Sequence, residues 1–274
     1  ELARRSTLFD DIVLDPEPSL WNIGAAMNLR RTLRDAGNTR IYDLQTSDRT
    51  GWYYRLLGPG ARPEWSGIVP GCSHYHHYKR PTLIHTIDRQ AEQLRIAGIS
   101  KVPRSDLAFM DGDVTRFGLP EKFVLLIPGS SARMAVKRWP APNYTELALR
   151  LVHHGLTPVV LGGPEEADAI RTIIDHCPEA INLEGKTTIF DLPSLGRQAL
   201  GCAGNDTGPM HMVAMTGCRT VAIFSTASFP DKAAPRGPSV TVLVREVLST
   251  LSVDDVEAAL LEPDENGGAM KAEP

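Results

Sequence analysis

Apolar runs that alternate with helical patterns constrain this chain more than any other feature of its sequence. The run 123–127 (FVLLI) contains no polar residue, which is typical of a strand buried on both faces of a parallel sheet. Helix and strand patterns then alternate at 143–154, 157–161, 165–176, 188–199, a strand ending at Asn205, a helix from Pro209, 220–224, 240–244 and 253–261. This alternation predicts right-handed βαβ units and a doubly wound parallel sheet.

Two of these helices carry a capping-box pattern. Asn143 is followed three residues later by Glu146, and Thr188 is followed three residues later by Asp191. In a capping box the first side chain accepts a hydrogen bond from a backbone N–H of the first turn, and the second side chain accepts one from the backbone N–H of the first residue. The helices are therefore expected to begin at Asn143 and Thr188.

The first 118 residues show the same alternation more weakly. Strands are expected at 11–14 and 40–44, helices at 26–36, 47–57 and 84–97, and a loop in the Gly- and Pro-rich stretch 58–78. Two such halves predict an α/β protein with two Rossmann-like lobes, at 1–118 and 119–262. The remaining residues, 263–274, lack an apolar pattern and are expected to be a disordered tail.

Composition narrows the classes of function. The formal net charge of −4 provides no global basic field for nucleic acid. The four cysteines contain no C-x-x-C pair, so zinc-ligand spacing is missing and the reduced cytosol is favoured. No apolar run approaches the roughly 20 residues that cross a bilayer, and the N-terminus lacks the apolar core of a signal peptide.

Three loops are expected to meet at the carboxyl edge of the second sheet, where open α/β sheets bind ligands. In the first, after 123–127, Gly129 lets the backbone approach a ligand. The hydroxyls of Ser130 and Ser131 can donate to phosphate oxygens, and Lys137 supplies a compact positive charge. A solvated surface loop would have the same composition. Because this loop follows a buried strand, phosphate binding and a solvated loop are about equally favoured.

The second loop contains two adjacent glutamates. A carboxylate about one βα unit after a phosphate loop is where Rossmann-type folds hydrogen-bond ribose hydroxyls. Glu166 is the candidate for that role. For Glu165, a favourable interaction with the helix dipole is the better interpretation, because acidic residues are common in first turns.

The third loop, 204–211 (GNDTGPMH), is the most specific signal in the chain. Asn205, Asp206 or Thr207 can cap the following helix, whose first N–H groups would then face a phosphate. Capping explains one polar residue at this turn. It does not explain an Asp, a Thr, Gly208 and His211 together, so a binding function is favoured.

Two clusters are weaker candidates for metal binding. The run 74–78 contains three histidines, but no further ligands occur at a fixed spacing, and a solvated or acceptor-facing loop is favoured. Asp111 and Asp113 match a D-x-D pattern, yet they lie in the expected linker, where an exposed acidic turn is the better interpretation. The sequence therefore predicts no metal site.

The run 205–211 resembles glycosyltransferase family 9, the ADP-heptose:lipopolysaccharide heptosyltransferases. The loops around Lys137 and Glu166 fall where that family has its other donor loops, and 183–188 resembles the segment that lines the adenine. The resemblance is strong from about residue 123 to residue 261 and looser before it.

This resemblance implies a GT-B fold and an inverting, metal-independent transfer of heptose from ADP-heptose to a lipopolysaccharide core. The ADP-sugar would be a substrate, and no cofactor is implied. By family analogy, the diphosphate would be held by Ser130, Ser131 and Lys137, the ribose by Glu166, the adenine side by Thr187, and the heptose and phosphate by Asp206, Thr207, Gly208 and His211. Lys137 and Asp206 would be catalytic.

The resemblance also leaves one role unassigned. The family opens with a strand and a Gly-Asp turn whose Asp is the general base. This chain begins after that point, so we expect a truncated N-terminal lobe and a base upstream of Glu1.

A lipid-linked saccharide acceptor implies a cytoplasmic protein that works at the cytoplasmic face of the inner membrane. Arg30, Arg31 and Arg34 could support peripheral contact there, and a solvated helix face explains them equally well. Two alternatives remain at this point: a nucleotide-sugar epimerase of the same fold, and a non-catalytic module that binds a nucleotide.

Overall fold

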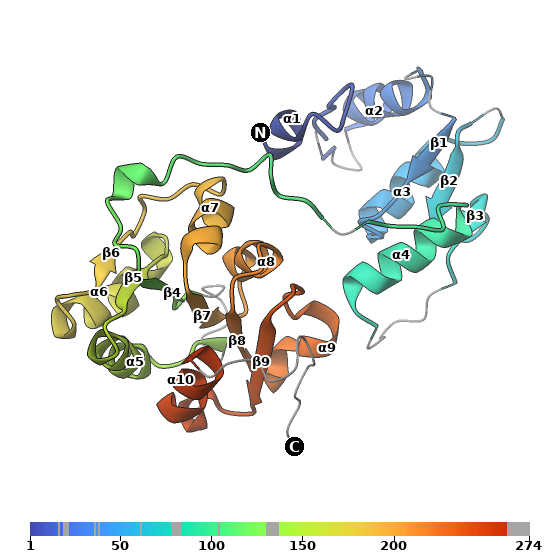
Figure 1. The fold of residues 1–274 in the computed structure, drawn as a ribbon. Coiled ribbons are helices and arrows are strands. Elements are labelled where there is room, and N and C mark those ends of the chain that lie inside the picture. Colours follow the sequence, from blue (N-terminus) through green and yellow to red (C-terminus); the bar gives the residue numbers. More distant parts are fainter. Residues whose placement is uncertain are drawn as a thin grey trace. The chain divides into compact units, whose positions relative to one another are not determined.

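The computed structural model describes residues 1–15, 17–18, 22–35, 37, 39–60, 62–77, 84–103, 105–129 and 137–261. The chain divides into two compact units, Glu1–Arg104 and Ser105–Pro274, each with its own parallel sheet (Figure 1). The expected tail at 263–274 lies outside the described residues.

The boundary between the units precedes the expected one at residue 118. Residues 105–118 belong to the second unit because they bond to its helix α7 (Asp191–Gln198). Gly112 N donates to Ser194 Oγ over 3.0 Å, and Arg197 pairs with Asp111. These polar contacts to one helix hold the stretch in which the sequence placed the linker against the rest of the second unit.

The second unit contains a six-stranded parallel sheet, which confirms the predicted α/β architecture. Its strands, in the order β6-β5-β4-β7-β8-β9, are Ile181–Asn182, Thr157–Val160, Phe123–Ile127, Gly201–Asn205, Thr220–Ser225 and Val240–Arg245. Leu125 of the central strand β4 lies opposite Val159 of β5 and Cys202 of β7.

Helices cover both faces of this sheet. The helical segments of the unit are η1 (Thr115–Phe117), α5 (Ala141–His153), η3 (Pro164–Glu166), α6 (Ala167–His176), α7, α8 (Gly208–Met215), η4 (Thr226–Ser228), α9 (Pro230–Ala233), η5 (Leu248–Thr250) and α10 (Val253–Leu261). Val124 and Leu126 of β4 pack in one apolar cluster with α5, α6 and α10, whereas Leu125 packs in another with α7 and α8. Because side chains alternate along a strand, both clusters require an unbroken apolar run.

Two predicted helix starts are wrong. Helix α5 begins at Ala141 after Pro140, and no side-chain hydrogen bond from a described residue caps it. Asn143 instead points its amide at Leu251 O, 3.4 Å away. Helix α7 begins at Asp191 rather than Thr188, although Asp191 does accept the Thr188 N–H as a capping box would require. Pro142 lies in the first turn of α5, where its φ is fixed near the helical value and it has no N–H that would need a cap.

The first unit has a three-stranded parallel sheet, β1 (Arg40–Tyr42), β2 (Glu64–Gly67) and β3 (His74–Tyr75). Its helices are α1 (Leu2–Ser6), α2 (Ile23–Asp35), α3 (Asp48–Leu56) and α4 (Thr86–Ile96). The expected loop at 58–78 therefore contains two short strands, whereas the expected strand at 11–14 is not formed. Trp65 of β2 is buried against the ring of Tyr54. This packing stabilises β2, although the surrounding glycines and prolines predicted a loop.

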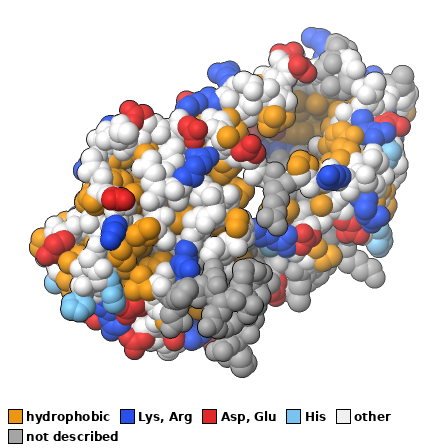
Figure 2. Space-filling model, in the orientation of Figure 1, with side chains coloured by type: hydrophobic (Ala, Val, Ile, Leu, Met, Phe, Trp, Pro, Cys, Tyr) orange, Lys and Arg blue, Asp and Glu red, His pale blue; other side chains and the backbone are white. Residues whose placement is uncertain are grey.

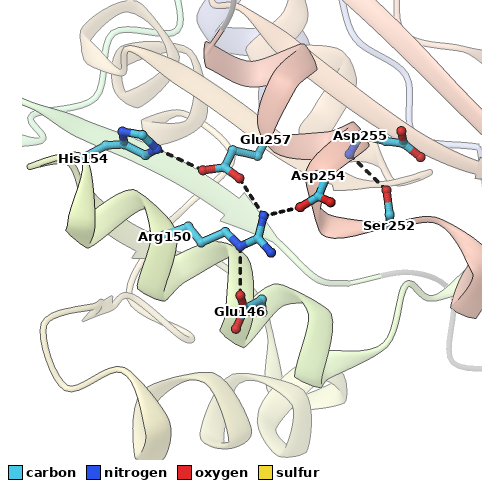
Figure 3. A network of polar contacts seen from close by, with 7 residues as sticks. All are labelled: Glu146, Arg150, His154, Ser252, Asp254, Asp255 and Glu257. Carbon is cyan, nitrogen blue, oxygen red and sulfur yellow. Dashed lines mark hydrogen bonds and ion pairs between the residues drawn. The ribbon is translucent and has the colours of Figure 1, made fainter.

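An ion-pair network joins the last helix of the second unit to α5 (Figure 3). Arg150 donates to Glu146 over 2.8 Å within α5, and to Asp254 and Glu257 of α10. His154 lies 2.9 Å from the other oxygen of Glu257. The network therefore supplements the apolar packing between α5 and α10 at its solvent-facing side.

Surface charge, the state of the cysteines and helix length were also considered in the sequence. Lys and Arg side chains are interspersed with Asp and Glu on the face shown in Figure 2. Cys72, Cys177, Cys202 and Cys218 are buried thiols outside any disulfide. None of the helices in the described ranges is long and apolar enough to span a membrane.

Candidate functional site

The three loops that the sequence singled out leave neighbouring strands at one edge of the second sheet. Strand β4 is paired with β5 on one side and with β7 on the other. The loops after these strands are therefore adjacent, and side chains from them meet in pairs. The contacts between these side chains define the candidate site.

Lys137 and Asp206 form the ion pair at its centre. Lys137 Nζ lies 3.1 Å from Asp206 Oδ2, and the side chains are only 18% and 15% exposed. Asp206 is held in place by its backbone, because its N–H donates to Ile223 O of β8 over 3.2 Å. An ammonium has three N–H donors, so the contact with Asp206 leaves Lys137 with capacity to bind an anion.

Asn205 fixes the loop that carries Lys137. Its side chain is fully buried at the end of β7. Asn205 Nδ2 donates to Pro128 O over 2.6 Å, and Asn205 Oδ1 accepts the Trp139 N–H over 3.0 Å. One amide thus ties together the two ends of the loop between β4 and α5. Its interpretation as a helix cap is wrong, because both of its polar atoms bond to this loop.

Trp139 anchors the same loop from the other side, and sequence analysis did not assign it a role. Its ring is 2% exposed, and Nε1 donates to Leu251 O over 3.0 Å. It packs edge-on against Tyr144 of α5 with ring centroids 4.8 Å apart. An aromatic residue directly after a Lys-Arg pair is the signal that could have identified this anchor.

Helix α8 directs its N-terminus toward the end of β7. Thr207 is its N-cap residue, and no capping hydrogen bond from the Thr207 side chain is formed with the described residues. Gly208 is exposed and has open space where a Cβ would stand. Thr207 and His211 are half-buried on the same turn. The N-terminus of α8 carries a partial positive charge from the helix dipole, and the backbone of Gly208 is exposed there, which suits an anion.

Glu166 connects the loops after β4 and β5. Its Oε2 accepts the Gly163 N–H over 2.9 Å, and its Oε1 lies 4.0 Å from Arg138. A Cβ at Gly129 would stand 3.0 Å from the Glu166 carboxyl carbon, so the backbone approach that Gly129 permits is to Glu166. Glu165 on the same turn is exposed. Arg138 was not singled out by the sequence, and it supplies a second cation at this edge.

The segment 183–188 lies beside the loop after β5. Gly185 N donates to Gly162 O over 2.9 Å, and Gly185 has a φ of +65° that favours glycine. Leu183 is buried, whereas Thr187 is half-buried. The structure thus brings Thr187 to the same edge as Glu166. Ser130 and Ser131 lie outside the described residues.

The clusters considered for metal binding have other partners. His74 Nε2 lies 3.2 Å from Glu64, and the buried His76 lies 3.2 Å from Glu92. Asp113 accepts hydrogen bonds from the hydroxyl and from the backbone N–H of Thr115, and these two bonds lower the pKa of the Asp113 carboxyl. Within the ranges that the structure describes, no three or more His, Cys, Asp or Glu side chains are grouped as a metal site would need.

The thiols beneath the site are unsuited to nucleophilic chemistry. Burial raises the pKa of Cys202 in β7 well above its ordinary value, and burial raises the pKa of Cys218 to about 12. A thiol acts as a nucleophile only as the thiolate. Both groups stay protonated near neutral pH, so the polar chemistry of this edge rests on Lys137, Asp206 and their neighbours.

Comparison of the sequence with family models identifies one family. The model of glycosyltransferase family 9 (heptosyltransferase) matches residues 27–256. Lipooligosaccharide heptosyltransferase 2 of Haemophilus influenzae is 27% identical over 112 residues, which are 39% of this chain and 32% of that relative. The matched region thus spans about a third of the relative's length.

Two solved structures share the fold. The glycosyl transferase family 9 protein of Veillonella parvula is 20% identical, with a TM-score of 0.75 over 95% of this chain and 86% of that one. The E. coli heptosyltransferase WaaC with ADP is 17% identical, with a TM-score of 0.66 over 93% of this chain and 80% of that one. These likenesses show that the chain has the α/β fold with parallel sheets of the GT-B heptosyltransferases.

Proposed function

The chain belongs to glycosyltransferase family 9, and we propose that it transfers heptose from ADP-heptose to a saccharide of the lipopolysaccharide core. The observation that carries this proposal is the Lys137–Asp206 pair beside the N-terminus of α8. It places a cation and a carboxylate, which come from two different loops, beside a helix N-terminus.

The first role we propose is neutralisation of the departing diphosphate. Transfer breaks the bond between heptose C1 and the β-phosphate oxygen, and that oxygen gains negative charge as ADP leaves. Lys137 and the dipole and exposed Gly208 backbone at the start of α8 would stabilise this charge, and Ser130 and Ser131 would add hydroxyl donors. Fixed donors of this kind act without a metal ion, and metal-independent transfer is part of the proposal.

The second role is recognition of the donor's sugars. Asp206, Thr207, Gly208 and His211 would contact the heptose and the adjacent phosphate. Glu166 would accept from the ribose, because an ionised carboxylate retains acceptor capacity beyond its bond to Gly163. Thr187 would lie along the adenine.

The proposal extends to the acceptor. Its hydroxyl would attack C1 from the face opposite the diphosphate and give up its proton to the general base that the family resemblance implies, as ADP departs. The configuration at C1 would therefore invert. We propose a lipid-linked acceptor reached at the cytoplasmic face of the inner membrane, supported by the family and by the basic residues of α2. Arg31 on that helix is exposed.

Calorimetry with different nucleotides tests the function. ADP-heptose and ADP are expected to bind at least about tenfold more tightly than UDP and UDP-glucose, a difference of about 1.4 kcal/mol. Excess EDTA is expected to leave both affinities unchanged. An affinity that magnesium restores after chelation would contradict the metal-independent mechanism, and equal binding of ADP and UDP would contradict the donor assignment.

Asp206→Ala separates the sugar from the nucleotide. The variant releases Lys137 from its counter-ion, so ADP affinity should hold or rise, whereas ADP-heptose should lose the contact with the carboxylate. Asp168→Ala, which removes an exposed carboxylate of α6, is the matched control. If Asp206→Ala weakens ADP and ADP-heptose equally, Asp206 only supports the loop.

A further inference from the structure

A single carboxylate joins two segments that are far apart in the sequence. Asp191 Oδ2 accepts the Thr188 N–H over 2.6 Å and the Thr188 hydroxyl over 2.9 Å. The same oxygen lies 2.7 Å from Arg116 Nη2. The Asp191 side chain is 2% exposed, so its charge depends on these partners.

On one side of this carboxylate lies the segment 105–118, with which the second unit begins. Gly112 packs directly on Asp191, where a Cβ would stand 3.0 Å from Asp191 Cα and closer still to the carboxylate. Arg197, nearly two turns further along α7, donates to Leu107 O over 2.9 Å and pairs with Asp111. The segment 105–118 is thus held against α7 by several contacts, and the side chain of Arg116 is the one that reaches the Asp191 carboxylate.

On the other side lies the segment 183–188. Leu183 N donates to Val160 O over 3.0 Å and Gly185 N donates to Gly162 O over 2.9 Å, which fixes the start of this segment to β5 and its loop. Thr188 fixes its end to Asp191. Thr187, the residue assigned to the adenine, is adjacent in sequence to the Thr188 contact.

The balance of forces at Asp191 favours the charged form. Burial alone would raise the pKa of the Asp191 carboxyl, but the hydrogen bonds from Thr188 and Arg116 outweigh it and hold the pKa below its ordinary value. Hydrogen bonds to an ionised group are stronger than neutral ones. Loss of Arg116 would leave a buried carboxylate bonded to Thr188 alone.

We infer that Asp191 is a positioning residue that couples nucleotide binding to the order of the segment 105–118 at the start of the second unit. The inference rests on the proposed function, because it takes ADP to lie along 183–188. A nucleotide that holds Thr187 and Thr188 in place also holds Asp191 in the position that Arg116 needs. By linkage, the contact with Arg116 must then strengthen nucleotide binding to the same extent.

Hydrogen exchange with and without ADP tests the coupling. In the wild-type chain, ADP is expected to slow amide exchange in 183–188 and also in 111–117. In Arg116→Met, ADP should still slow exchange in 183–188 but leave 111–117 unchanged, and ADP affinity should fall about fivefold, the lower end of typical coupling. Arg116→Lys keeps a cation within reach of Asp191 and should restore most of both effects.

Arg171→Met is the matched control, because it removes an exposed arginine that pairs with Asp168 within α6. It should behave as the wild-type chain in both measurements. A purely structural role for Arg116 would raise exchange in 111–117 without any dependence on ADP.

The outcomes separate the two proposals. Absence of ADP binding by the wild-type chain overturns the proposed function and this inference with it. ADP binding that leaves exchange in 111–117 unchanged in the wild-type chain overturns the inference alone. So does an Arg116→Met variant whose ADP affinity and ADP-dependent exchange match those of Arg171→Met.

Discussion

The sheet of the second unit is covered by apolar side chains on both faces, whereas the sheet of the first unit is backed by a small aromatic cluster and by buried polar groups. Every residue of β4 is buried and apolar. In the first unit, Arg89 Nη1 donates to Thr46 Oγ1 over 2.8 Å, and Gln93 Nε2 donates to Asp43 O over 2.8 Å. The second unit is therefore stabilised mainly by area buried, and the first depends more on matched hydrogen bonds.

This difference has a consequence for the site. A close-packed apolar interior resists displacement, so the carboxyl edge of the second sheet offers a rigid base for loops that carry charge. Asn205 and Trp139 tie the residues next to Lys137 to this interior. The candidate site is built on the unit with the more extensive core.

The largest expected effect is a cavity at the centre of the second sheet. Leu125→Ala should lower the free energy of unfolding of the second unit by about 2–5 kcal/mol, because it deletes fully buried methyl groups between β5, β7 and α8. Hydrogen exchange in denaturant would follow each unit separately. Leu149→Ala, at a position that is 41% exposed on α5, is the control and should cost far less. Equal destabilisation of both units by Leu125→Ala would contradict the comparison.

A smaller effect is expected from the polar core of the first unit. Gln93→Ala leaves the carbonyls of Asp43 and Ser66 without their amide donor and should destabilise the first unit by about 1–3 kcal/mol. Gln90→Ala is the control, because Gln90 bonds to Leu44 O at a water-accessible position where solvent can replace it. If both variants lower the free energy of unfolding equally in the exchange experiment, burial does not determine how much these hydrogen bonds stabilise the first unit.

The smallest effect is expected from the network between α5 and α10. Hydrogen bonds from Arg150 and then from His154 lower the pKa of Glu257 below its ordinary value, against the opposing effect of burial. Between the lowered pKa of the folded chain and the ordinary pKa of a glutamate, the unfolded chain therefore binds more protons than the folded chain. The contribution of Glu257 to the free energy of unfolding is complete above about pH 4.3 and is lost as the pH falls through the lowered pKa. Arg150→Met should remove this acid-dependent part of the stability.

Urea unfolding at several pH values between neutrality and about pH 3 checks this prediction. The wild-type chain and Arg150→Met should differ at neutral pH and converge at acid pH. Arg171→Met, which removes another exposed pair, should follow the wild-type curve closely. A difference that is constant with pH would mean that Arg150 acts through its aliphatic stem.

The sequence predicted the regular elements of the second unit better than those of the first. Strand Phe123–Ile127 and helix Val253–Leu261 have the predicted bounds, because their apolar patterns coincide with complete burial or with one buried face. Strands β2 and β3 are four and two residues long, too short to show a period, and they lie among glycines and prolines.

The site was predictable in its location but not in its contacts. The order of buried strands and polar loops placed Lys137, Glu166 and Asp206 at one edge. The bonds of Asn205 reach residues 77 and 66 positions away, so no local pattern could distinguish them from a helix cap. The same holds for Arg116 and Asp191, which are 75 positions apart.

The most direct test of the account is the ADP affinity of Lys137→Met, measured by calorimetry beside that of Lys122→Met. Lys122 is exposed and precedes β4, at the opposite edge of the sheet. Removal of a charge-assisted hydrogen bond to the diphosphate should cost about 1.5–3 kcal/mol, a roughly ten- to hundredfold loss of affinity. The unpaired Asp206 carboxylate would add to that loss by repelling the phosphates. An ADP affinity for Lys137→Met that equals that of Lys122→Met would contradict the assignment of this edge as the nucleotide-sugar site.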